Sequence, residues 1–141
     1  MPSAETVLLD THAWIWLRLG ETSAFRRSSL DAIRSAGARS ALRVSVISVW
    51  ELGMLAAKGR IQLDLPAAEW ARRSLEAPGL LLAELTPDIA IEASNLPGEL
   101  SGDPADRIIV ATARATGATL FTKDRSILAY GRRGHLKVSA L

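Results

Sequence analysis

Four acidic residues of this 141-residue chain lie at the ends of apolar segments, at positions that a fold can bring to one cleft. They are Asp10, Glu51, Asp106 and Asp124. Carboxylates that crowd together cannot all ionise unless a cation lies among them. A divalent metal ion would relieve this repulsion, lower the pKa of water and hold a scissile phosphate. The pattern is therefore typical of a metal-binding nuclease site.

Each acid taken singly also has a structural explanation. Asp10 ends a predicted strand and could cap the helix that follows, and Asp124 could cap the last helix in the same way. Ser48 and Glu51 fit a capping box at the start of another helix. Capping gives no reason, however, for acids to gather at one end of a sheet, so we favour a shared site.

Asp103 and Asp106 fit the N-cap and the third position of one helix, with Pro104 at the first position. We interpret Asp103 as the cap. Asp106 begins a stripe with helical spacing that points inward, where a carboxylate is unfavourable unless it is paired or metal-bound. The other members of this stripe are Ile109, Val110 and Ala113.

Polar and basic residues flank the acids. Thr122 and Lys123 precede Asp124 and Arg125 follows it, which gives the hydroxyl and cations that a phosphoryl-transfer site needs. We expect the side chain of His12 to point away from Asp10, and metal-activated water needs no imidazole base. The expected substrate-binding residues are basic: Arg107, Lys123 and Arg125.

The composition limits which metal could bind. The chain has no cysteine and two histidines, so the ligands must be mostly oxygen atoms, which favour Mg²⁺ or Mn²⁺ over zinc or copper. The net charge is +2, or +6 with the four candidate acids set aside, and fourteen of the seventeen basic residues are arginine. A basic surface around an acidic pocket suits a phosphate-backbone substrate, although an arginine-rich genome explains the composition equally well.

The length and the 48% apolar composition suit one domain, residues 1–141. Apolar strands alternate with amphipathic helices, which implies an α/β fold with a mainly parallel sheet and helices on both faces. No apolar stretch is long enough to span a membrane and no secretion signal is visible, so we expect a soluble, cytoplasmic protein. Strands are predicted at 6–10, 42–47, 80–85, 118–122 and 135–141, and helices at 12–20, 23–36, 48–58, 66–77, 87–95, 104–117 and 124–131.

The helix predicted at 48–58 is apolar nearly all round and must be covered on more than one side. We infer a subunit or partner interface there. The tryptophans Trp14, Trp16 and Trp50 lie in apolar helices, so we interpret them as core or interface residues rather than as base-stacking platforms.

Four segments together resemble the PIN-domain nucleases, specifically the toxins of VapBC type II toxin–antitoxin systems. They are LLDTH (8–12), VISVWELGMLAAKGRIQL (46–63), DPADRIIVATARATGATLFTKD (103–124) and ILAYG (127–131). The resemblance implies a PIN-like three-layer α/β/α fold with a central, mainly parallel sheet of about five strands. It also implies that the four acids ligate Mg²⁺ or Mn²⁺ in an endoribonuclease, with supporting polar residues at Thr11, Ser48, Asp103 and Thr122.

The same resemblance implies partners: an RNA substrate such as tRNA, rRNA or mRNA, a second copy in a homodimer, and a VapB-type antitoxin that blocks the site. Two alternatives remain open. A phosphotransfer or phosphatase-like domain would use Asp10 as a covalent nucleophile near Lys123, and a non-catalytic RNA-binding PIN module would bind RNA without cutting it.

Overall fold

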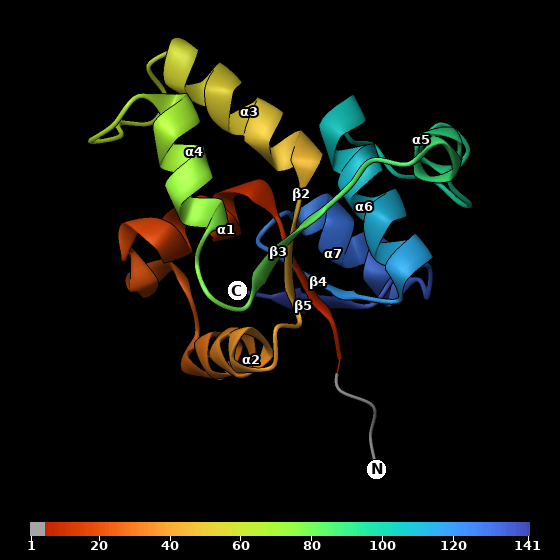
Figure 1. Ribbon diagram of the computed structural model, residues 1–141. Coiled ribbons are helices and arrows are strands. Elements are labelled where there is room, and N and C mark those ends of the chain that lie inside the picture. Colours follow the sequence, from red (N-terminus) through yellow and green to blue (C-terminus); the bar gives the residue numbers. More distant parts are fainter. Residues whose placement is uncertain (1–4) are drawn as a thin grey trace.

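The computed structural model describes residues 5–141, which form a five-stranded parallel sheet with helices on both faces (Figure 1). The strand order is β3-β2-β1-β4-β5, and every neighbouring pair is parallel. This confirms the predicted α/β/α architecture. The strands are β1 (Val7–Leu9), β2 (Leu42–Ser45), β3 (Leu80–Ala83), β4 (Thr119–Thr122) and β5 (Val138–Ala140).

The strand order creates a switch point at β1. From β1 the chain moves outward in one direction through β2 and β3, and later returns to add β4 and β5 on the other side. In open parallel sheets, ligands bind in the crevice at such a point, beyond the carboxyl ends of the strands. The crevice here lies at the ends of β1 and β4.

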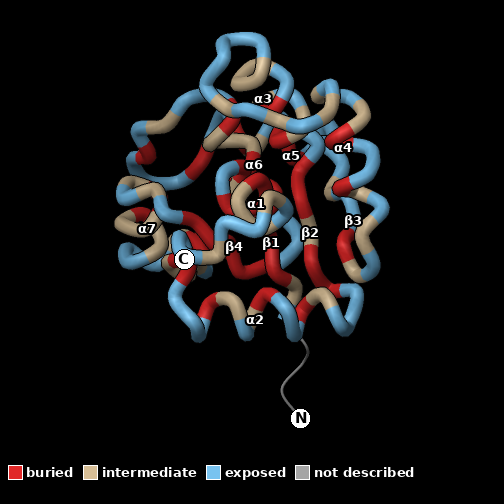
Figure 2. The backbone as a smooth tube through the Cα atoms, turned by 90° about the vertical axis from the view of Figure 1, so that its left-hand side faces the viewer, coloured by how far each residue is buried: buried red, intermediate tan, exposed pale blue. Residues whose placement is uncertain are grey.

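Two hydrophobic cores lie on the two faces of the sheet, because side chains alternate between faces along each strand. In β1, Val7 and Leu9 join one core, whereas Leu8 joins the other. Figure 2 shows the buried residues concentrated in the strands and on the helix faces that turn toward them. The first core is covered by α1 (Thr11–Leu19), α2 (Arg27–Ala38), α3 (Val46–Ala57) and α4 (Ala67–Leu75), and the second by α5 (Pro87–Ala93), α6 (Pro104–Thr116) and α7 (Arg125–Arg132).

The predicted start of α3 at Ser48 is wrong. The helix begins directly after β2, because the Oγ of Ser45 accepts a hydrogen bond from the Ile47 amide at 3.2 Å and caps the helix. Ser48 is therefore a buried residue inside the helix, and Glu51 lies in its second turn. The proposed capping box does not form.

Smaller differences concern element ends. The helix predicted at 23–36 is split into a 3-10 turn (Thr22–Ala24) and α2, because Phe25 is extended and buried between them. The strands predicted at 80–85 and 135–141 are shorter, since pairing stops at Ala83 and starts at Val138. Among residues 5–141, no helix has the length and apolarity needed to cross a membrane.

Candidate active site

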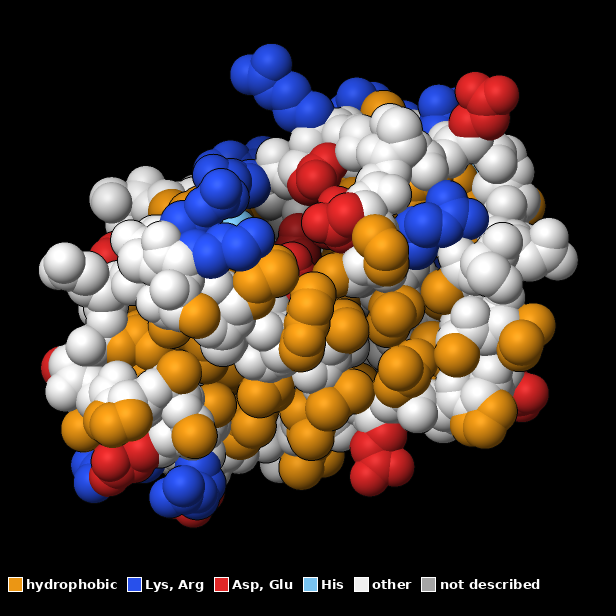
Figure 3. Space-filling view, turned by 90° about the horizontal axis from the view of Figure 1, so that it is seen from above, with side chains coloured by type: hydrophobic (Ala, Val, Ile, Leu, Met, Phe, Trp, Pro, Cys, Tyr) orange, Lys and Arg blue, Asp and Glu red, His pale blue; other side chains and the backbone are white. Residues whose placement is uncertain are grey.

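The four predicted acids share one pocket of about 300 Å³ at the carboxyl ends of the strands. In Figure 3, acidic side chains lie in a hollow on the face above the sheet, with basic side chains on either side. The acids come from four separate elements that the strand order brings together. The lining residues are Asp10, Thr11, His12, Ala13, Glu51, Asp103, Asp106, Lys123 and Asp124.

Asp10 lies at the carboxyl end of β1, beside the switch point, where it both caps α1 and lines the pocket. Its Oδ1 accepts a hydrogen bond from the Thr11 amide at 2.8 Å, and its Oδ2 accepts one from the Thr122 hydroxyl at 2.5 Å. Burial raises the pKa of Asp10, while these two hydrogen bonds act in the opposite direction. The hydrogen bonds fix the orientation of the carboxylate.

Glu51 reaches the pocket through a hydrogen-bonded chain that begins in the core. The buried Thr11 hydroxyl donates to Glu51 Oε1 at 2.6 Å and lies 2.8 Å from the Ser48 hydroxyl. A hydroxyl has one proton, so Ser48 donates to Thr11 and Thr11 donates to Glu51. This chain joins α1 to α3 and explains why a polar residue stands at each position.

Asp106 is an acid whose protonation is strongly perturbed. Burial, followed by the charges of Asp103, Asp10, Asp124 and Glu51, raises the pKa of Asp106 to about 7. Its carboxylate has no hydrogen-bond donor among the described residues, although its backbone amide donates to the capping Asp103 Oδ1 at 2.9 Å.

The sequence interpretation missed the importance of Gly102 beside Asp106. A Cβ at that position would lie 3.1 Å from the Cβ of Asp106 and 3.4 Å from its Oδ2. The absence of a side chain at Gly102 leaves room for the carboxylate at the pocket wall. The sequence signal for this role was a glycine directly before the two aspartates Asp103 and Asp106.

Asp124 caps α7, as predicted for its structural role, and lines the pocket as well. Its Oδ1 accepts hydrogen bonds from the Ser126 amide at 2.8 Å, the Ser126 hydroxyl at 2.7 Å and the Ile127 amide at 3.2 Å. The Asp124 amide donates to the Thr122 hydroxyl at 3.0 Å, and Thr122 in turn donates to Asp10. Thr122 thus links the acids at the ends of the two neighbouring strands.

The basic candidates separate into two groups. Lys123 lines the pocket, whereas Arg125 is exposed and does not line it. The guanidinium of Arg107 instead donates hydrogen bonds to the carbonyls of Ala93 at 2.8 Å and Leu100 at 3.0 Å. Arg107 therefore anchors the loop before α6 through its guanidinium.

His12 is also among the residues that line the pocket, while the orientation of its side chain away from Asp10 stays a prediction. Burial lowers the pKa of His12, with the charge of Asp10 opposing this shift and that of Lys123 adding to it. The imidazole lies beside the indole of Trp16, with 5.4 Å between the two ring centroids.

The donor set in the pocket suits a hard cation, since every acid offers carboxylate oxygens and neither sulfur nor cysteine is present. Within residues 5–141, no three side chains of the metal-ligating types stand close enough together to enclose an ion as they are placed. Two observations fit a cation at this site: the pKa of Asp106 is raised, and its carboxylate accepts no hydrogen bond from the described residues.

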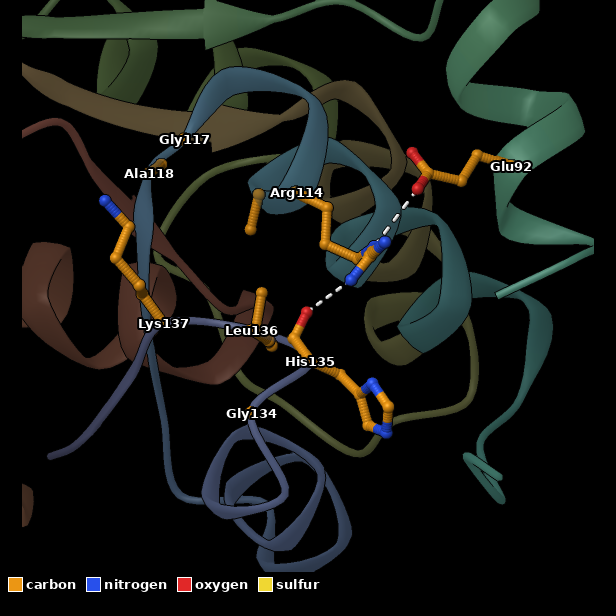
Figure 4. Close-up of a pocket in the computed structure, with 9 residues that line it drawn as sticks. Glu92, Arg114, Gly117, Ala118, Gly134, His135, Leu136 and Lys137 are labelled. Atoms are coloured by element: carbon orange, nitrogen blue, oxygen red, sulfur yellow. Dashed lines mark hydrogen bonds and ion pairs between the residues drawn. The ribbon is translucent and has the colours of Figure 1, made fainter. Parts of the chain in front are cut away.

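A larger cavity of about 500 Å³ lies at the opposite end of the sheet, near the end of α6 (Figure 4). There Arg114 pairs with Glu92 at 3.0 Å and donates to the His135 carbonyl, so it ties α5 to the loop before β5. This cavity contains one acid, already paired, and offers no cluster of ligands. The smaller acidic pocket is therefore the better candidate for chemistry.

The pKa of Asp106 predicts how the stability of the metal-free protein depends on pH. Its folded-state pKa of about 7 lies above the ordinary value of 3.8, so the folded state binds the proton more tightly than the unfolded state. Stability should therefore fall as pH rises from about 4 to about 7. We expect a higher melting temperature at pH 5.5 than at pH 8 in EDTA, by several degrees.

Asp106→Asn is the matched comparison for this pH dependence, because it removes one titrating group and leaves the others. Between pH 5.5 and pH 8, the melting temperature of the variant should decrease less than that of the parent, as measured by circular dichroism. An identical pH profile for parent and variant would show that Asp106 titrates normally in the folded protein.

Comparison with known proteins identifies the family. The PIN domain family matches residues 7–132, which is most of the chain and includes all four acids. This chain belongs to the PIN-domain family. The fold is thus that of a PIN domain.

This PIN domain is similar to the VapC ribonucleases. It is 38% identical over 122 residues to Ribonuclease VapC22 of Mycobacterium tuberculosis, a match that covers 86% of this chain and 89% of the relative. At this identity and coverage, the PIN domain belongs to the same VapC group.

Solved structures support the fold of this PIN domain. VapBC2 of Rickettsia felis, bound to a promoter DNA fragment, has a TM-score of 0.68 at 15% identity and covers 95% of this chain and 97% of its own. DNA-bound VapBC of Salmonella typhimurium has a TM-score of 0.67 at 18% identity, covering 96% and 98%. At these identities the likeness concerns the fold alone.

Proposed function

We propose that this PIN domain is a metal-dependent endoribonuclease and the toxin of a type II toxin–antitoxin pair. The observation that carries the proposal is the convergence of four acids in one pocket at the switch point of the sheet. The similarity to Ribonuclease VapC22 supports RNA as the substrate. The cut bond would be a phosphodiester in single-stranded or loop RNA.

Asp10, Glu51, Asp106 and Asp124 would hold Mg²⁺ or Mn²⁺. When bound, such an ion supplies Lewis-acid chemistry by lowering the pKa of water and neutralising charge on the phosphate. Thr122 orients the carboxylate of Asp10, and the Ser48–Thr11 chain orients that of Glu51. Supporting hydrogen bonds of this kind fix ligand geometry before the substrate arrives.

Substrate contacts would come from the basic rim of the pocket. Lys123 is the cation among the residues that line it, and Arg125 lies exposed two positions further along the chain. We retain both as phosphate-binding residues. Arg107 is a weaker candidate because two backbone carbonyls already occupy its guanidinium.

The two alternatives are less well supported. A covalent phosphotransfer mechanism would use Asp10 alone as the nucleophile and gives no role to Glu51, Asp106 and Asp124, which line the same pocket. A non-catalytic RNA-binding module has no need for four acids around one pocket, because acids repel phosphate. The nuclease proposal gives a role to all four acids of the pocket.

The test is cleavage of tRNA and rRNA by the purified protein in Mg²⁺, in Mn²⁺ and in EDTA. We expect cleavage with either metal ion, none in EDTA, and recovery when the metal ion is restored in excess. Cleavage that survives exhaustive chelation would contradict the metal-dependent mechanism. A folded, metal-loaded protein that cuts no RNA would favour the RNA-binding alternative.

We also propose two protein partners, a VapB-type antitoxin and a second copy of the chain. Both solved structures above are VapBC complexes, which supports an antitoxin. The second copy is supported by an exposed apolar surface that continues from beside the acids across α3 to the edge strand β3 (Figure 3). The exposed large hydrophobic side chains of the described residues are Val46, Trp50, Leu81, Leu82, Leu85 and Ile91.

Trp50→Glu should weaken self-association, because Trp50 is 58% exposed in the single chain and a tryptophan buries a large apolar area at an interface. We expect sedimentation velocity to show a shift from dimer toward monomer. Ala115→Glu is the matched control, since it makes the same charge change at an exposed residue of α6. A parent protein that stays monomeric at high concentration would contradict the dimer.

A further inference from the structure

Lys123 lines the acidic pocket but pairs with none of its acids. The ion pairs in residues 5–141 are Arg73–Glu69 and Arg114–Glu92, both away from the pocket. The ammonium of Lys123 lies instead over the ring of Trp16, 4.6 Å from its centroid. A cation beside several carboxylates is thus held on an aromatic face.

Trp16 is well placed to hold this cation. It lies on α1 four residues after His12, and the two ring centroids are 5.4 Å apart. The indole is partly buried and packs against the first core, so its position is fixed by the fold. Trp14 is the contrasting residue of the same helix, because it is fully buried and hydrogen-bonded to Ser74.

The parallel pairing of β1 with β4 brings these residues together. Lys123 directly follows β4 and Trp16 lies in the helix that directly follows β1, so both stand at the same edge of the sheet as the acids. Lysine has a long, flexible side chain, and ordering it before binding reduces the entropy lost when a ligand is bound. Without the ring, the nearest attraction for the ammonium is the acid cluster.

We propose that Trp16 is a positioning residue for RNA binding. It holds the Lys123 ammonium at the mouth of the pocket and clear of the acids, where the ammonium binds a phosphate of single-stranded RNA. The carboxylates thereby stay free for the metal ion. This inference rests on the proposed function, since it assigns a substrate contact of the same site.

The test is a double-mutant cycle on the affinity for a labelled single-stranded RNA, measured in Mn²⁺ with Asp106→Asn as the background so that the RNA stays intact. Trp16→Leu keeps apolar bulk but removes the aromatic face, and we expect about two- to five-fold weaker binding, the size of an exposed cation–π interaction. Lys123→Ala should weaken binding more and reduce the salt dependence by about one phosphate contact.

The cycle separates positioning from direct contact. If Trp16 acts through Lys123, the double variant binds no more weakly than Lys123→Ala alone. Trp16→Phe, which keeps an aromatic face, should restore most of the affinity. In the active protein, Trp16→Leu should raise KM and leave kcat unchanged.

Three outcomes would overturn the inference. Additive losses in the double variant would mean that Trp16 contacts RNA itself, and unchanged affinity in Trp16→Leu would mean that Lys123 needs no support. Equal losses in Trp16→Leu and Trp16→Phe, with lowered melting temperatures, would mean that Trp16 acts by packing alone. Cleavage of RNA by the parent protein is measured separately. If the cycle shows that Trp16 acts through Lys123 but the parent never cuts RNA, the nuclease proposal is contradicted and the role of Trp16 in RNA binding is kept.

Discussion

Asp106→Asn should abolish RNA cleavage while leaving the metal-free protein at least as stable as the parent at neutral pH. Loss of a supporting residue around a metal typically lowers activity 10- to 100-fold, so loss of a ligand should lower it by more than about 100-fold. Stability should be preserved because an amide removes one of several crowded charges. The capping hydrogen bond also survives, since it comes from the backbone amide of residue 106.

Added metal should then separate the two proteins. A ligand at about 100 times its dissociation constant stabilises the folded state by about 2.7 kcal/mol, which corresponds to an increase on the order of 10 °C in melting temperature for a chain of this size. The parent should show this increase with Mn²⁺ and the variant much less. Differential scanning calorimetry with and without Mn²⁺ measures both effects.

Asp103→Asn is the matched control for Asp106→Asn. Asp103 lines the same pocket and carries the same charge, but its Oδ1 is already occupied in capping α6, and an asparagine caps a helix equally well. We expect this variant to keep most of its activity. If Asp103→Asn is inactive and Asp106→Asn is active, the roles of the two aspartates are reversed.

Thr11→Val should give the second large effect, because it removes the middle of the chain from Ser48 to Glu51. The buried Ser48 hydroxyl would lose its acceptor, and an unsatisfied buried hydroxyl lowers stability by about 1–3 kcal/mol. Glu51 would lose the hydrogen bond that lowers its pKa, so it would bind a metal ion less well at neutral pH. We expect activity to fall by about 10- to 100-fold.

Thr112→Val provides the comparison for Thr11→Val. Thr112 is equally buried, but its hydroxyl donates to the Ile108 carbonyl within α6 and supports no residue of the acidic pocket. Melting temperature and RNA cleavage should both change little in this variant. A normal rate of cleavage by Thr11→Val would show that the Ser48–Thr11–Glu51 chain has no part in the site.

Local sequence was sufficient to place three of the acids. Asp10 and Asp124 come just after short apolar strands, and each is the N-cap of the helix that follows. Asp106 lies on the buried stripe of α6, which its spacing to Ile109 and Val110 predicted. These predictions succeeded because strand ends and helix periodicity depend on residues that are close in the chain.

Glu51 shows where local patterns were insufficient. Ser48 and Glu51 fit a capping box, yet Ser45 starts the helix one turn earlier and Ser48 serves Thr11 of a different helix. A capping box and a buried hydrogen-bonded chain both use a serine followed three residues later by a glutamate, so the sequence pattern does not tell them apart. Only the contact between α1 and α3 decides between them.

The sequence by itself predicted the alternation of strands and helices and the four acids that line one pocket, with oxygen atoms as the expected metal ligands. The tertiary structure alone decided that β1 lies between β2 and β4, and this order sets which side chains meet at the pocket. It placed His12 and Lys123 beside Trp16 and engaged Arg107 with backbone carbonyls. The physical reason is that a side chain's orientation depends on the groups packed around it, which local sequence patterns do not show.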